Sequence, residues 1–119
     1  MRNISFALTT PQIRARTKTV TRRIGWRFLK PGDVLMACEK CQGITKGGLV
    51  RLGPIRVVSV RQERLDAITI EDVVREGFGP ENGGLSAGGF VSMFCCHMRC
   101  QPSAEVTRIE FEYIEPPTV

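Results

Sequence analysis

The chain has 119 residues, of which 42% are apolar, and its formal net charge is +5. This length suits one compact domain, 1–119, and the apolar fraction is large enough for a hydrophobic core, which excludes a disordered chain. The apolar runs are short, the segment 34–38 being typical. They exclude a transmembrane helix and a secretory signal, so the sequence predicts a cytoplasmic protein with no membrane contact.

The positive charge is concentrated in the N-terminal third. Eight Lys and Arg residues precede the first acid, Asp33, and the rest of the chain holds nine basic and twelve acidic residues. The densest segment is RARTKTVTRR, residues 14–23, with five cations, three threonines and no acid. Cations this dense repel one another unless an anion offsets them. The segment therefore predicts a surface for phosphate or another anion, the alternative being a solvated basic face.

Four elements are predicted in the first half of the chain from apolar patterning and turn signals. Thr10 and Pro11 supply the cap and the first position of a short helix, and β-branched residues favour extended chain. In order, the elements are a strand over 3–8, the helix from 10 to about 17, an extended segment over 19–23, and a strand over 33–39.

The second half is predicted to hold two strands and two helices. They are a Val- and Ile-rich strand over 55–63, a helix over 69–78, a helix over 89–98, and a strand over 105–114. Thr69 caps the first helix with Asp72 as a capping-box acid, and alternation in the last strand turns Arg108 to solvent. Five or so strands with three short helices, and no regular βαβ alternation, predict one α+β domain built as a small mixed β-barrel.

Five cysteines fall into two groups, 38/41 and 95/96/100. Two thiolate pairs from distant segments can close a tetrahedral site for one structural zinc ion, which would pin the loop 41–48 to the last helix. Cys96 and Cys100 share a helix face, which favours Cys96 over Cys95, and His97 is a further alternative ligand. Free thiols in the core are the other interpretation. His97, the only histidine in the sequence, is otherwise interpreted as a packing residue on the apolar face of its helix, with a general base as the alternative.

The segments TKTVTRR, LKPGDVL, EGF and VTRIEFEY resemble the ASCH domain family of PUA-like β-barrels. The resemblance spans nearly the whole chain, and it is closest to small phage- and prophage-associated members. Those members carry Phe-Cys followed some five residues later by Cys, which favours Cys95. The zinc ligands implied are Cys38, Cys41, Cys95 and Cys100.

The resemblance also implies a function. PUA-like domains bind RNA or modified nucleotides, and some small bacterial ASCH proteins are amidohydrolases that remove the acetyl group of N4-acetylcytidine. Their site is a lysine, a threonine three residues later and a distant glutamate, which here match Lys18, Thr21 and Glu76. Arg16 departs from the family, which often has glycine there. A bulky cation at this position would narrow the pocket or change its ligand.

Amide hydrolysis needs a nucleophile, a base and a group that holds the developing oxyanion. Thr21 offers a hydroxyl to attack or to position water, Lys18 is the candidate base, and Glu76 can pass a proton to the leaving amine. Neighbouring arginines would lower the pKa of Lys18 and Glu76 would raise it, and the sequence leaves the balance open. Lys18 and Thr21 meet only if the chain bends between them, because residues three apart on a strand face opposite ways.

Further polar and aromatic side chains in the basic third are candidates for binding a phosphate or a base. They are Arg14, Arg16, Arg22, Arg23 and Trp26, with core packing as the alternative for the ring. Three functions fit these features: an amidohydrolase acting on a modified nucleoside, a non-catalytic RNA-binding module, and a phage-encoded protein that binds and blocks a host factor.

Overall fold

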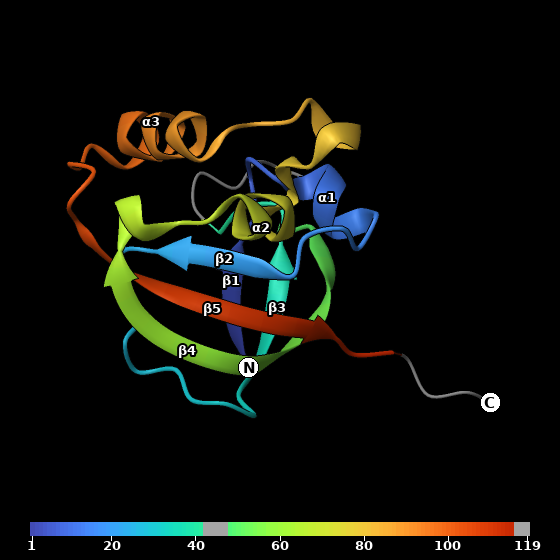
Figure 1. Ribbon diagram of the computed structural model, residues 1–119. Helices are drawn as coiled ribbons and strands as arrows, with labels where there is room; N and C mark the ends of the chain where they lie inside the picture. Colours follow the sequence, from blue (N-terminus) through green and yellow to red (C-terminus); the bar gives the residue numbers. More distant parts are fainter. Residues whose placement is uncertain (42–47, 116–119) are drawn as a thin grey trace.

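The computed structural model of the protein describes residues 1–41 and 48–115. One sheet contains five strands, in the spatial order β1-β3-β4-β5-β2. Their bounds are Arg2–Ser5 for β1, Val20–Arg23 for β2, Val34–Cys38 for β3, Arg51–Arg64 for β4 and Glu105–Tyr113 for β5. β1 and β3 are parallel, and the other neighbours are antiparallel. The predicted α+β class and mixed sheet are confirmed, and the sheet curls into a half-barrel with β1 and β2 at its edges (Figure 1).

Strand β4 gives the sheet its curl. Its first residues pair with β3, and its register against β5 shifts between Val57 and Ser59, which inserts an extra residue. A bulge of this kind bends the strand and increases its twist. β4 therefore arcs around the bottom of the molecule and brings β5 and β2 across from β1 and β3 (Figure 1).

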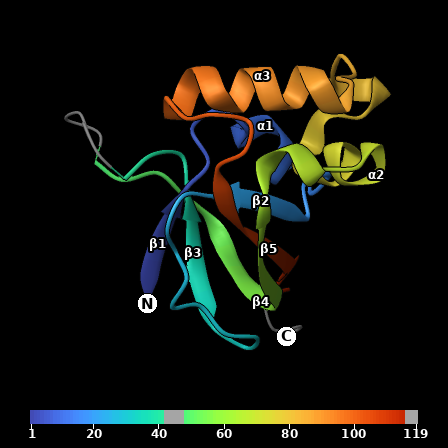
Figure 2. The same ribbon diagram turned by 60° about the vertical axis from the view of Figure 1, so that its left-hand side comes forward.

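The helices gather at one end of the sheet. The bounds are Thr10–Arg14 for α1, Ile70–Val73 for α2 and Ala87–Met98 for α3, with a π-helical turn η2 at Val74–Phe78 and 3-10 turns η1 at Leu65–Ala67 and η3 at Pro80–Asn82. The Thr69 cap is confirmed, because its Oγ1 accepts from the Asp72 N–H at 3.2 Å. α3 lies across the top of the sheet in both views (Figures 1 and 2). No helix in residues 1–41 and 48–115 is long and apolar enough to cross a membrane.

Two hydrophobic clusters hold these layers together. The larger one lies inside the curl of the sheet and includes Ile4, Phe6 and Phe111. The smaller one joins α2 and α3 to the sheet and includes Phe90 and Phe94. The concave face of the sheet and the underside of α3 thus meet along a boundary between two cores.

Strand β5 departs from the predicted alternation. Val106, Thr107, Arg108 and Ile109 are all buried, with Arg108 only 6% exposed. β4 and β2 cover the two edges of β5, and Asp72 of α2 binds Arg108, so the face that carries Arg108 is covered at this end. The expectation that Arg108 faces solvent is wrong for this reason.

Candidate functional site

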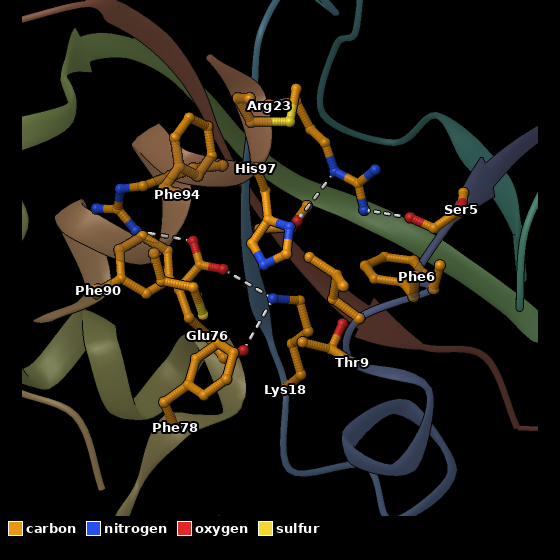
Figure 3. A pocket seen from close by; sticks show the side chains of 16 residues that line it. Ser5, Phe6, Thr9, Lys18, Arg23, Glu76, Phe78, Phe90, Phe94 and His97 are labelled. Carbon is orange, nitrogen blue, oxygen red and sulfur yellow. Dashed lines mark hydrogen bonds and ion pairs between the residues drawn. The ribbon is translucent and has the colours of Figure 1, made fainter. Parts of the chain in front are cut away.

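A pocket of about 230 Å³ opens between the two cores. The end of β1 and the loop after it form one wall, β2 and the η2 turn form the floor, and α3 forms the roof (Figure 3). Aromatic side chains cover much of the wall and roof, and charged groups lie at the bottom. The lining residues include Ser5, Phe6, Lys18, Thr21, Arg22, Arg23, Glu76, Phe90, Phe94 and His97.

The chain bends before β2 and so brings Lys18 and Thr21 into the same pocket. α1 ends at Arg14, earlier than the sequence indicates, and Arg16 takes a left-handed conformation with φ 59°. Lys18 therefore precedes the strand, whereas Thr21 lies within it. Both residues are 3% exposed. The chain thus bends between Lys18 and Thr21, which is the condition for both side chains to reach one site.

Glu76 is presented by the π-helical turn η2. Such turns are rare and frequently occur at functional sites. Gly77 follows with φ 100°, a conformation that favours glycine, and a Cβ there would lie 2.8 Å from Cγ of Gln12. Gln12 also donates to the Gly77 carbonyl at 3.2 Å. The close approach of α1 to this turn holds the Glu76 carboxylate over Lys18.

Lys18 and Glu76 form a buried ion pair. The Nζ of Lys18 lies 2.7 Å from Oε1 of Glu76 and 2.8 Å from its carbonyl oxygen (Figure 3). Burial lowers the pKa of Lys18, and this effect outweighs the opposing attraction of Glu76. Arg23 and Arg22 lower it further, as smaller causes. The sequence left open whether the pKa of Lys18 is raised or lowered. In the structure it is lowered, and burial rather than the arginines is the main cause.

Beneath this pair, Asp72 is the centre of a network of arginines. Arg108 donates to both of its oxygens at 2.7 and 3.0 Å, and Arg22 donates at 2.6 Å. Hydrogen bonds from Arg108, and then from Arg22, hold the pKa of Asp72 well below its usual range, although burial opposes them. Arg22 also reaches the second oxygen of Glu76 at 3.1 Å. The Asp72 carboxylate therefore supports the pocket from below rather than returning to cap its own helix.

Arg23 faces the pocket from the side opposite this network. Its Nε donates to Oγ1 of Thr21 at 3.1 Å, and its Nη2 donates to the carbonyl oxygen of Ser5 at 2.6 Å (Figure 3). The guanidinium lies 4.8 Å from the centre of the Phe6 ring. Because Ser5 ends β1 and Arg23 ends β2, this side chain bridges the two edges of the sheet.

Three of the predicted anion-binding residues lie elsewhere. Arg14 and Arg16 line a separate hollow of about 650 Å³, where Arg16 binds Glu115 and stacks over the Tyr113 ring. Arg16 is not among the residues that line the Lys18 pocket, so it does not narrow that pocket. Trp26 packs partly against the larger core. The basic segment is thus divided between two sites.

His97 lines the mouth of the pocket and is exposed. Its interpretation as a packing residue was wrong, because α3 covers an open pocket at this point rather than a filled core. The sequence carried a usable signal, since His97 shares its helix face with Phe90 and Phe94. That face is the one that roofs the pocket (Figure 3).

The cysteines form two pairs. α3 ends at Met98, and Arg99 takes a left-handed conformation, which turns the chain back so that Sγ of Cys100 lies 3.9 Å from Sγ of Cys95. The helix-face argument for Cys96 fails because Cys100 is outside the helix, and Cys96 is exposed.

At the other group, burial raises the pKa of the Cys38 thiol, and Cys41 raises it further. Among residues 1–41 and 48–115, no three His, Cys, Asp or Glu side chains are grouped closely enough to hold one metal ion. Most of the loop that zinc was expected to pin, residues 42–47, lies outside the described residues.

No protein-family model matches the sequence, and no curated protein matches it either. Several solved structures have a similar fold, among them the following three. An ASCH domain from Lactobacillus crispatus JV V101 is 12% identical with a TM-score of 0.61, over 94% of this chain and 78% of that one. Protein EF3133 from Enterococcus faecalis V583, of the family DUF984, is 13% identical with a TM-score of 0.63, over 96% and 76%. The hypothetical protein PH0355 is 18% identical with a TM-score of 0.61, over 95% and 96%.

These identities are low, so the comparisons establish the fold. Nearly the whole chain is superposed in each case, including the half-barrel and the helices above it. The sequence resemblance and the structural similarity point to the same domain type. The protein therefore has the fold of an ASCH domain.

Proposed function

We propose that the protein hydrolyses the amide of an N4-acylated cytidine or a related modified nucleoside, free or within RNA. One observation carries the proposal: Lys18, Thr21 and Glu76 reach a single pocket from segments 58 residues apart, with Lys18 bound to Glu76. The aromatic roof and wall suit a flat base, because every base can stack on such rings.

The neutral form of Lys18 is oriented to act as a base. Its two hydrogen bonds, to Oε1 and to the carbonyl oxygen of Glu76, use both N–H groups of a neutral amine. The lone pair is then directed away from Glu76. A pKa lowered by burial increases the neutral fraction at a given pH, which general-base catalysis requires.

The proposed reaction proceeds by attack of an oxygen nucleophile on the amide carbon. Lys18 takes the proton of the hydroxyl, either that of Thr21 or that of a water held by Thr21. The oxygen–carbon bond forms, the carbon–nitrogen bond breaks, and Glu76 relays the proton from Lys18 to the leaving amine. If Thr21 is the nucleophile, a water then cleaves its ester. The products are a carboxylic acid and cytidine.

The direct test is incubation of the purified protein with N4-acetylcytidine, followed by chromatography of the products. We expect cytidine to appear and Lys18→Ala to reduce its rate by about 10²–10⁴-fold, the usual contribution of a general base. Lys30→Ala is the matched control, because Lys30 is exposed and outside the pocket. Absence of turnover at high enzyme concentration would exclude this substrate.

A second candidate function is binding of RNA or a modified nucleoside without hydrolysis. Arg23, whose guanidinium lines the pocket without an acidic partner among the described residues, favours it. Salt-dependent RNA binding by a protein without turnover would support this function. A stoichiometric complex with a host protein that survives Lys18→Ala would instead indicate an interaction protein.

We also propose that Cys38, Cys41, Cys95 and Cys100 bind one structural zinc ion. Support comes from the spacing of Cys95 and Cys100, whose 3.9 Å sulfur separation is close to the ~3.8 Å of two thiolates on a tetrahedral zinc. Native mass spectrometry is expected to show one bound zinc that Cys38→Ser and Cys100→Ser lose. Cys96→Ser, at an exposed thiol, is expected to retain it. An apo mass for the wild-type protein would contradict the assignment.

A further inference from the structure

Arg23 lines the pocket as a cation without a carboxylate partner among the described residues. The buried carboxylates near it are already paired, Glu76 with Lys18 and Arg22, and Asp72 with Arg22 and Arg108. Arg23 donates instead to two neutral oxygens, Oγ1 of Thr21 and the carbonyl of Ser5. Its third nitrogen, Nη1, makes no hydrogen bond to any side chain or backbone group in residues 1–41 and 48–115.

The electrostatic setting of Arg23 differs from that of its paired neighbours. Burial lowers the pKa of Arg23 to about 10, against the attraction of Glu76 and Cys41. The pKa of Arg108 is raised, chiefly by its hydrogen bonds to Asp72. Arg23 remains a cation at neutral pH. Arg23 is half-buried, so its charge is partly withdrawn from water without a bound carboxylate, and a bound counter-ion offsets the cost of that withdrawal.

We propose that the ligand of this pocket carries an oxyanion group, a carboxylate or a phosphate, that binds the Arg23 guanidinium. The proposal rests on the proposed function only in taking the remainder of the ligand to be a nucleoside. The Phe6 ring packs against the guanidinium and fixes its plane. The outer edge of the guanidinium then presents its N–H groups in the fork that matches two oxygens of one anion.

Two sources of the oxyanion share this chemistry. One is the carboxylate that amide hydrolysis releases, since Arg23 donates to the hydroxyl of Thr21 beside the attacked carbon. The other is the phosphate of a nucleotide, in which case the substrate is an acylated cytidine nucleotide rather than the free nucleoside. Each source predicts a different preferred ligand.

The test is a set of binding titrations that requires no turnover. Cytidine, cytidine 5′-monophosphate, and acetate in the presence of cytidine are titrated into the wild-type protein by calorimetry or by NMR chemical shifts. With a phosphate source, the monophosphate binds about 10- to 100-fold more tightly than cytidine, the usual worth of a charged hydrogen-bonded pair. With a carboxylate source, acetate binds to the protein that holds cytidine.

Variants at position 23 test whether the Arg23 side chain causes the preference for an anionic ligand. Arg23→Met is expected to abolish the preference for the anion, and Arg23→Lys to restore part of it by keeping the charge without the fork. Should Arg23→Met fail to fold, Arg23→Gln replaces it, because an amide can still donate to Ser5. Arg27→Met is the matched control, since Arg27 is exposed and paired with Glu105 outside the pocket.

The outcomes separate this inference from the proposed reaction. Arg23-dependent anion binding by a protein that does not hydrolyse N4-acetylcytidine supports the inference and refutes the reaction alone. Equal affinity for cytidine and its monophosphate, with no Arg23-dependent binding of acetate, overturns the inference even where hydrolysis is observed. An anion preference that persists in Arg23→Met and Arg23→Gln also overturns it.

Discussion

Replacement of Asp72 by asparagine is expected to lower the free energy of unfolding by about 3–5 kcal/mol, the usual cost of removing one partner of a buried ion pair. Asp72 is 3% exposed and accepts hydrogen bonds from Arg22 and Arg108. Asparagine keeps the shape of the side chain but leaves these two guanidinium groups short of a counter-charge. Urea denaturation of the two proteins measures the difference.

The loss should depend on pH in a defined direction. The pKa of Asp72 is held well below its ordinary value of 3.8, so its contribution is complete above that value and is lost as the pH falls further. The stability curves of wild type and Asp72→Asn are therefore expected to approach each other below about pH 4. Asp66→Asn is the matched control, because Asp66 pairs with Arg64 at the surface and should have little effect. Unchanged stability of Asp72→Asn at neutral pH would show that the network is not a structural support.

If the proposed amide hydrolysis takes place, replacement of Glu76 by glutamine is expected to reduce it by about 10²–10⁴-fold, the usual effect of removing a proton-transfer group. It should also change the pH dependence. The Glu76 carboxylate raises the pKa of Lys18, so its removal lowers that pKa further and moves the acid limb of kcat to lower pH. The measurement is kcat against pH for both proteins.

Two comparisons make this result specific. Thr21→Val should lower kcat by removing the hydroxyl, while the carboxylate that shifts the Lys18 pKa remains in place. Glu71→Gln, at an exposed acid of α2, should leave both the rate and the profile unchanged. A large rate loss in Glu76→Gln without any shift of the acid limb would show that Lys18 is not the base.

The elements of the fold could largely be predicted because their patterns are local. The Val- and Ile-rich run of β4, the Thr69 cap and the apolar face of α3 each indicate their element within a few residues of chain. The end of α1 was placed too late because the left-handed turn at Arg16 occurs at a residue type that rarely adopts it. The sequence indicated a mixed sheet but not that its edges would remain apart.

The charge network could not be predicted, because its contacts are long-range. Asp72 and Arg108 are separated by 36 residues, and the sequence indicated a capping-box acid for the first and a solvent-facing cation for the second. Their burial follows from the position of β5 between β4 and β2 and from the approach of α2 to it. The positions Lys18, Thr21 and Glu76 came from the family resemblance, whereas their burial and the dominant cause of the Lys18 pKa came from the structure.

The bridge from Arg23 to Ser5 has a consequence for how the domain moves. Strands β1 and β2 share no backbone ladder, so this side chain joins the two margins of the half-barrel. An anion that engages the guanidinium with two oxygens draws on the nitrogen that now holds Ser5. Occupancy of the pocket and local opening of β1 are then thermodynamically linked, each altering the free energy of the other. Ligand binding in the pocket would thus change the amide-exchange rate of β1, a strand at the opposite edge of the sheet from β2.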